Sequence, residues 1–187
     1  MTDQDNFSRA LKLLADGRLD EARIYLEELL RQDPDNPDLL YNLGLCYVDL
    51  GQLDQGIELL GRCLQVAPQH SHACVALGIA YQKKGDLARA KEATSQALAA
   101  DPRNPVALKN LGAILGREGD SLRALYYLRQ SYQANPQDPQ TVYGLAFAYM
   151  EMGDIEQAQK HFQMVLDMPA PAELGALART GLRESAV

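Results

Sequence analysis

The chain has 187 residues, of which 47% are hydrophobic, so it can bury a core and is not expected to be disordered. Its formal net charge is -7 and its pI is near 4.9, which argues against a nucleic-acid-binding surface and against adhesion to anionic membranes. No apolar run is long enough to span a bilayer, and the polar start MTDQDNFSRA resembles neither a secretory signal nor a lipid-anchor signal. Three scattered cysteines do not form a disulfide framework, so the expected setting is the reducing cytoplasm.

The helices expected along the chain follow a 34-residue period. Five glycines recur at this interval: Gly17, Gly51, Gly85, Gly119 and Gly153. Each is expected to end a first helix in the left-handed conformation. A second helix follows and ends near a proline, at Pro34, Pro68, Pro102 and Pro136 in the first four repeats. New first helices are expected after the N-cap residues Asn36, Asn104 and Asp138, each followed by a proline.

This period divides the chain into five repeats and a final segment. In chain order these are residues 3–36, 37–70, 71–104, 105–138 and 139–170, followed by 171–187. The residue seven before each glycine and the residue five after it are small, as at Gly44 and Gly56, so the two helices of a repeat can approach closely. Helical spacing of apolar residues predicts one more helix in the final segment, with Leu174, Leu177, Ala178 and Leu182 on one face.

The pattern resembles the tetratricopeptide repeat (TPR). The stretches LLYNLGLCYVDLGQLDQGIELLGRCLQVAP and VALGIAYQKKGDLARAKEATSQALAADP carry its leucine-glycine, tyrosine, glycine, alanine and proline marks. The resemblance implies an all-α fold: a single structural domain in which five helix-turn-helix repeats form a right-handed α-solenoid, closed by a C-terminal capping helix. It also implies a binding scaffold whose first helices line the inner, concave surface.

The stretch QHSHAC raises the question of a metal site, because His70, His72 and Cys74 alternate there. When the repeats are aligned, His70 occupies the cap position, Cys74 a core position, and His72 a position near the inner rim. These side chains should therefore point in different directions, and we predict no metal and no cofactor. No serine or cysteine has a histidine placed to activate it, and His161 occupies a packing position, so we expect no enzyme.

A second apolar face on the first helices predicts a peptide-binding groove. Its residues lie ten and six positions before the repeat glycines: Tyr41, Leu45, Val75, Ile79, Tyr143 and Phe147. A helix that is apolar on two sides must bury both faces or offer one to a ligand. The alternative is that neighbouring first helices pack on these residues.

Polar residues refine the expected groove. Asn42 and Asn110 occupy a position at which asparagines of some family relatives contact the main chain of a bound peptide. Local hydrogen bonds are an equally good explanation of these two residues. Lys83, Lys109 and Arg117 could form a positive spot that suits an acidic side chain or chain terminus of the ligand. The alternative for these cations is charge pairing along the rim with Asp49 and Glu151.

The leading hypothesis is therefore a non-enzymatic adaptor that binds an extended or helical segment of another protein through apolar anchors on that segment. An acidic group on the segment would suit the positive spot. Nucleic acid and membrane insertion are not expected. One alternative is a scaffold that self-assembles through its uncapped first repeat, where Phe7 is expected at the surface. Another is a cytoplasmic secretion chaperone that holds apolar segments of an exported client.

Overall fold

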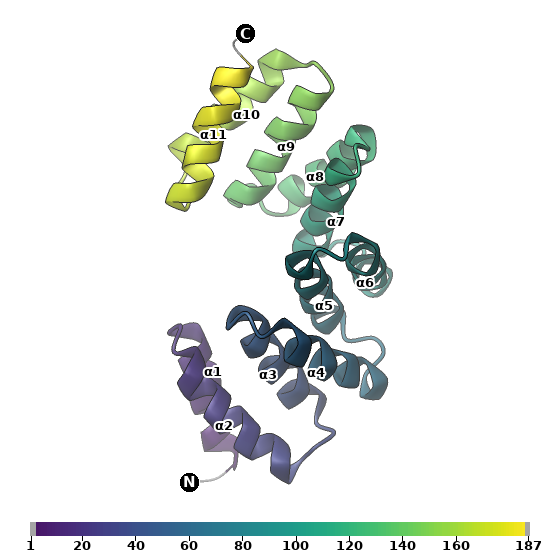
Figure 1. Ribbon diagram of the computed structural model, residues 1–187, viewed down its shortest axis with the longest axis vertical. Coiled ribbons are helices and arrows are strands. Elements are labelled where there is room, and N and C mark those ends of the chain that lie inside the picture. Colours follow the sequence, from purple (N-terminus) through teal and green to yellow (C-terminus); the bar gives the residue numbers. More distant parts are fainter. Residues whose placement is uncertain (1–2, 186–187) are drawn as a thin grey trace. The chain divides into compact units, whose positions relative to one another are not determined.

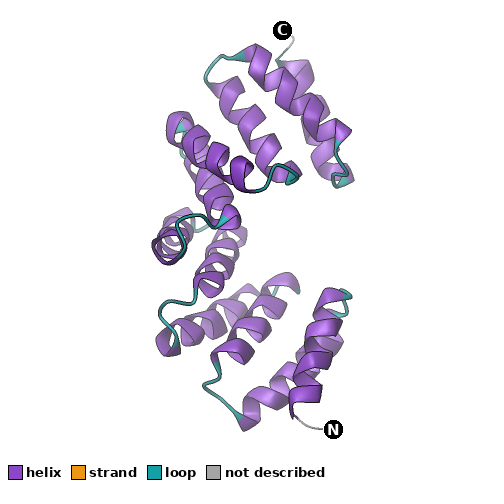
Figure 2. Ribbon diagram, turned by 180° about the vertical axis from the view of Figure 1, so that it is seen from behind, coloured by secondary structure: helices purple, strands orange, loops and turns teal. Residues whose placement is uncertain are grey.

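The computed structural model describes residues 3–185, which form eleven α-helices and no strand (Figures 1 and 2). The all-α class predicted from the sequence is confirmed. Contacts divide the chain into an N-terminal unit, Met1–Ala100, and a C-terminal unit, Asp101–Val187. The last two residues of the predicted capping segment, 186–187, lie outside the described residues.

The helix bounds follow the 34-residue period. The N-terminal unit contains α1 (Asp3–Ala15), α2 (Leu19–Gln32), α3 (Pro37–Asp49), α4 (Leu53–Val66), α5 (Ser71–Lys84) and α6 (Leu87–Ala100). The C-terminal unit contains α7 (Pro105–Arg117), α8 (Ser121–Ala134), α9 (Pro139–Glu151), α10 (Ile155–Asp167) and α11 (Ala172–Glu184). Within each unit every helix packs against the next one along the chain (Figure 1). The eleven helices agree with five repeats and a capping helix, whereas the repeat bounds and the single domain stay predictions.

The turns and caps form as the sequence predicts. The five repeat glycines all have positive φ, between 73° at Gly17 and 83° at Gly85, so they adopt the left-handed conformation that ends a helix. At the start of α3 the Asn36 side chain accepts hydrogen bonds from the backbone N–H groups of Asp38 and Leu39. Asn104 and Asp138 cap α7 and α9 in the same way. These local signals set the helix ends.

Small residues allow the two helices of a repeat to touch. A Cβ atom added at Gly56 in α4 would lie 2.6 Å from Cγ2 of Val48 and 2.9 Å from the carbonyl oxygen of Gly44 in α3. In the C-terminal unit a Cβ added at Gly112 would lie 2.6 Å from Cγ of Leu128. Side chains larger than hydrogen at these glycines would force the helices apart.

Each unit has its own core. In the N-terminal unit, Leu26, Leu40 and Leu60 are fully buried. In the C-terminal unit the core includes Phe162, which α11 covers so closely that a Cβ at Gly181 would collide with its ring. Helix α11 therefore shields the apolar face of α10, as expected of a capping helix.

Candidate functional site

The predicted apolar groove residues of the N-terminal unit differ in exposure. Tyr41 and Leu45 in α3 and Ile79 in α5 are half-buried at the edge of the core. Val75 in α5 is only 8% exposed. Val75 therefore has little surface to offer a ligand, whereas Tyr41, Leu45 and Ile79 keep exposed surface.

In the C-terminal unit, too, some predicted groove residues are exposed and others are buried. Phe147 in α9 is 37% exposed, and Tyr143 is half-buried with its ring centroid 5.8 Å from that of Phe162. Asn110 in α7 is only 7% exposed, which leaves little of it for a ligand. Packing against the second helix of the same repeat therefore covers part of Tyr143, whereas Phe147 remains at the surface.

Asn42 is engaged within its own helix. Its Nδ2 group donates a hydrogen bond of 2.7 Å to the carbonyl oxygen of Asp38, one turn earlier in α3. The local hydrogen bond that the sequence allowed as an alternative is therefore present.

Two of the three predicted groove cations have partners in the fold. Nζ of Lys83 donates to the carbonyl oxygen of Val48 at 3.2 Å and lies 3.8 Å from a carboxylate oxygen of Asp49. Nζ of Lys109 is held more tightly, as described next. Arg117 is exposed at the end of α7. Lys83 therefore has the rim partner Asp49 that the sequence allowed as an alternative, although both side chains stay about half exposed.

Lys109 links the first helices of two successive repeats in the C-terminal unit. Its Nζ lies 3.1 Å from Oδ2 of Asp138 and donates a hydrogen bond of 2.8 Å to Oε1 of Gln140, both at the start of α9. Burial opposes ionisation of Asp138, but the hydrogen bond from Thr141 and the charge of Lys109 outweigh it, so the pKa of Asp138 lies below its ordinary value. The pair is about four-fifths buried on both sides, so water screens it less than a surface ion pair.

The same contact position recurs at the boundary between the second and third repeats. Tyr41, like Lys109, lies ten residues before its repeat glycine. Its ring centroid lies 4.9 Å from that of His70 and 6.3 Å from that of His72, which match Asp138 and Gln140 in register. In both units, therefore, the residue at this position reaches the first turn of the next repeat.

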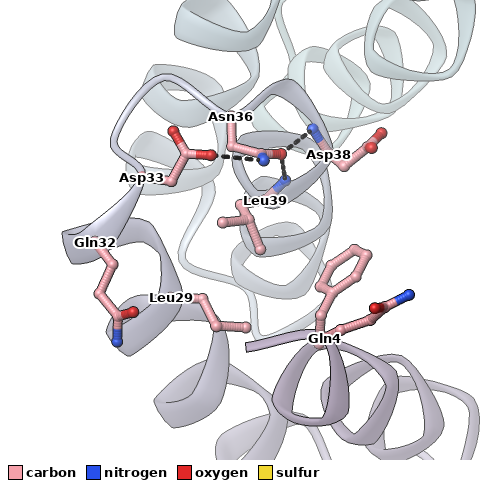
Figure 3. Close-up of a pocket in the computed structure, with 8 residues that line it drawn as sticks. Gln4, Leu29, Gln32, Asp33, Asn36, Asp38 and Leu39 are labelled. Atoms are coloured by element: carbon pink, nitrogen blue, oxygen red, sulfur yellow. Dashed lines mark hydrogen bonds between the residues drawn. The ribbon is translucent and has the colours of Figure 1, made fainter. Parts of the chain in front are cut away.

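At the boundary between the first and second repeats, the corresponding position is occupied by Phe7 and borders a cavity. A cavity of about 300 Å³ opens where α1, α2 and α3 meet (Figure 3). Its apolar lining consists of Phe7, Leu29 and Leu39. Its polar lining consists of Gln4, Gln32, Asp33, Asn36 and Asp38. Sequence reasoning missed this cavity, because the repeat position places Phe7 beside the next repeat but does not show whether space remains there.

Carboxylates flank one side of this cavity. Asp33 and Asp38 lie on either side of Asn36, whose Nδ2 group donates a 2.9 Å hydrogen bond to Oδ2 of Asp33 (Figure 3). Because the side-chain oxygen of Asn36 also caps α3, both ends of its amide group are hydrogen-bonded. The amide is therefore fixed in orientation and fixes the carboxylate of Asp33. No lysine or arginine is among the residues that line the cavity.

The histidines of QHSHAC have separate structural roles. Nδ1 of His70 accepts a hydrogen bond of 3.0 Å from the backbone N–H of Ala73 and thereby caps α5. His72 is exposed and Cys74 is only 2% exposed, as their register predicts. Across residues 3–185, no group of three or more histidine, cysteine, aspartate or glutamate side chains is arranged to hold a metal ion. Over the same residues, no helix is long and apolar enough to cross a membrane.

Two large side chains are strongly exposed on the second helix of the fourth repeat. Leu122 and Tyr126, one turn apart in α8, are 71% and 62% exposed. The sequence analysis did not single out this pair.

Comparison with known proteins agrees with the fold. The sequence profile of the tetratricopeptide repeat family matches residues 13–62, 49–115 and 117–179. A thermophilic TPR protein of Thermus thermophilus is 23% identical, with a TM-score of 0.78 over 97% of this chain and 99% of that chain. MamA of Desulfovibrio magneticus is 21% identical, with a TM-score of 0.75 over 89% of this chain and 94% of that chain.

A third solved structure is longer. A chain of the APC/C hetero-tetramer Cut9–Hcn1 is 15% identical, with a TM-score of 0.90 over all of this chain and 37% of that chain. At these identities the three structures show a shared fold and nothing more. No curated protein matches the chain significantly. The profile match covers well over half of the sequence, and the chain therefore belongs to the tetratricopeptide repeat family.

Proposed function

We propose that the protein is a non-enzymatic adaptor that binds a segment of another protein on the inner faces of its first helices. The observation that carries this proposal is the set of apolar side chains that repeat on these faces and stay partly exposed. They are Tyr41, Leu45 and Ile79 in the N-terminal unit, and Tyr143 and Phe147 in the C-terminal unit. The family fold is generally a protein-interaction module, which supports the same conclusion.

The chemistry of the faces favours a segment with apolar anchors. Burial of a large apolar side chain contributes roughly 1.5–3 kcal/mol when it leaves water completely. The helices are already ordered by their cores, so most of the ordering entropy of binding falls on the partner segment. Arg117, which is exposed, is the cation we assign to an acidic group of the ligand, because Lys83 and Lys109 are engaged within the fold.

Site-specific photocrosslinking in the native host tests the adaptor function. A benzophenone amino acid replaces Phe147 on the inner face of α9 or, as the matched control, Tyr126 on the outer face of α8. Both positions are exposed aromatic residues of the C-terminal unit. We expect one partner sequence to crosslink at Phe147 and not at Tyr126, and the crosslinked segment, made as a peptide, to bind the purified protein.

The peptide then allows a direct check of the anchors. Phe147→Ser should weaken its binding and leave the helix content unchanged, since Phe147 is already partly exposed. Equal crosslinking at the inner and outer positions, or binding that Phe147→Ser does not alter, would contradict the adaptor function.

A second candidate function is a self-assembling scaffold, which the exposed pair Leu122 and Tyr126 favours. Two large apolar side chains on one solvent-facing helix form the kind of patch that marks interaction surfaces. Sedimentation velocity over a wide concentration range tests this candidate. Self-assembly predicts a sedimentation coefficient that rises with concentration and that stays constant once Leu122→Glu and Tyr126→Ser are introduced. A single monomeric species at all concentrations would exclude it.

A further inference from the structure

The cavity between α1, α2 and α3 carries an inference about the partner. We propose that it binds a lysine or arginine side chain of the partner protein, with the apolar stem on Phe7, Leu29 and Leu39 and the cationic group at Asp33 and Asp38. The inference rests on the adaptor function proposed above and adds a basic residue to the partner's apolar anchors.

The protein contains its own example of such a contact. Lys109 lies ten residues before Gly119, and its ammonium contacts Asp138 and Gln140 at the start of the next repeat. Phe7 lies ten residues before Gly17, and the residues that match Asp138 and Gln140 are Asn36 and Asp38. In the C-terminal unit, therefore, a cation from this repeat position binds at the start of the next first helix.

In the N-terminal unit this place lacks an internal cation. Phe7 supplies an aromatic ring in place of the lysine, and about 300 Å³ remains empty beside it. The carboxylate of Asp38 stands where the C-terminal unit has the neutral Gln140, and Asp33 adds a second carboxylate. The first-repeat cavity thus has more negative charge than the site that holds Lys109, and among residues 3–185 no basic side chain lines it.

The lining favours a basic side chain over other occupants. Leu29 and Leu39 are 5% and 6% exposed, so they form an apolar floor that suits the methylene stem of lysine or arginine. A purely apolar side chain would desolvate the carboxylates without replacing their hydrogen bonds. A cationic end supplies charge-assisted hydrogen bonds to them. Residues 1–70 contain thirteen acidic residues and six basic ones, so the surrounding field also attracts a cation.

Titration of the full chain with a single amino-acid derivative tests the proposal. The protein carries ¹³C-labelled leucine methyl groups, and the probe is Nα-acetyl-arginine amide. Nα-acetyl-citrulline amide is the matched control ligand, because it has nearly the same shape and no charge. We expect the methyl signals of Leu29 and Leu39 to shift saturably with the arginine derivative and not with the citrulline derivative. An equal response to both, or no response to either, would overturn the proposal.

Variants distinguish direct contacts with Asp33 and Asp38 from a general effect of negative charge near the cavity. Asp33→Asn with Asp38→Asn should raise the midpoint of the arginine titration roughly tenfold or abolish it, because two charge-assisted contacts are lost. Asp35→Asn lies in the same turn and does not line the cavity, so this control should leave the midpoint unchanged. A midpoint that Asp35→Asn raises as much as the double variant does would show a mere charge effect and refute the site.

A third variant tests the comparison with Lys109 directly. Phe7→Lys supplies an internal cation at the matching position, and we expect it to remove the response to the arginine derivative. An undiminished response would contradict the proposed equivalence. This titration is independent of the crosslinking at Phe147, so either proposal can fail without the other.

Discussion

The Lys109 ammonium lies 3.1 Å from the carboxylate of Asp138, so a side chain from one repeat meets the N-terminal cap of the next first helix. Asp138 thus has two roles in the C-terminal unit: it accepts a hydrogen bond from the backbone N–H of Gln140, and it holds the buried end of Lys109. Because both roles converge on one carboxylate, its removal affects the helix start and the contact between repeats together.

Replacement of Asp138 should show both roles. Asp138→Ala removes the cap and leaves the mostly buried Lys109 without its carboxylate, so we expect a loss of roughly 2–4 kcal/mol of unfolding free energy. Asp138→Asn keeps a capping oxygen and should cost less. Urea denaturation followed by circular dichroism measures the difference. Equal losses in the two variants would show that the cap contributes nothing measurable.

The same carboxylate predicts a pH dependence. The pKa of Asp138 is lower in the folded protein than its ordinary value of 3.8, so folding favours the ionised form. Its contribution to stability is complete above that ordinary value and is lost as the pH falls through the lower folded value. The stability difference between the wild type and Asp138→Asn should therefore stay constant from neutral pH down to about pH 4 and shrink as the pH falls further. Urea titrations at a series of pH values measure it, and a difference that stays constant over the whole range would contradict the assigned direction.

Two glycines of α4 should respond to alanine with opposite signs. Gly56→Ala places a methyl group 2.6 Å from Cγ2 of Val48, so we expect a loss of about 1–3 kcal/mol from overpacking. Gly61 has no heavy atom within 4 Å of an added Cβ. Gly61→Ala should therefore stabilise the helix by about 0.5–1 kcal/mol. Thermal denaturation compares the two variants, and a similar change in both would show that helix propensity alone governs this helix.

The three cysteines should be inert in the folded protein. Cys46, Cys63 and Cys74 are all buried, and burial raises the pKa of Cys46 and of Cys63 to about 11. The reactive thiolate is therefore scarce near neutral pH as well as inaccessible. A thiol-specific disulfide reagent should detect none of these cysteines at about pH 8 in the native protein and all three in denaturant. Rapid native labelling of any of them would show local opening of its helix pair.

The candidate site was only partly predictable from the sequence. Register located Tyr41, Leu45, Ile79, Tyr143 and Phe147 on the second face of the first helices, and these residues keep exposed surface. The repeat position could not distinguish them from Val75, which lies ten residues before its glycine as Tyr41 and Tyr143 do and is buried. Exposure depends on how closely neighbouring helices approach, and that distance is set by all the side chains between them.

The sequence alone determined the repeat, the helix ends and the close contact within a helix pair. Each follows from local rules: a glycine with positive φ, a capping oxygen, a proline, or two small residues at helical spacing. Only the tertiary structure decided which charges are paired and where space remains. Lys109 meets Asp138 while the matching position of Phe7 borders a cavity, because these outcomes depend on side chains from two or three helices that are distant in the sequence.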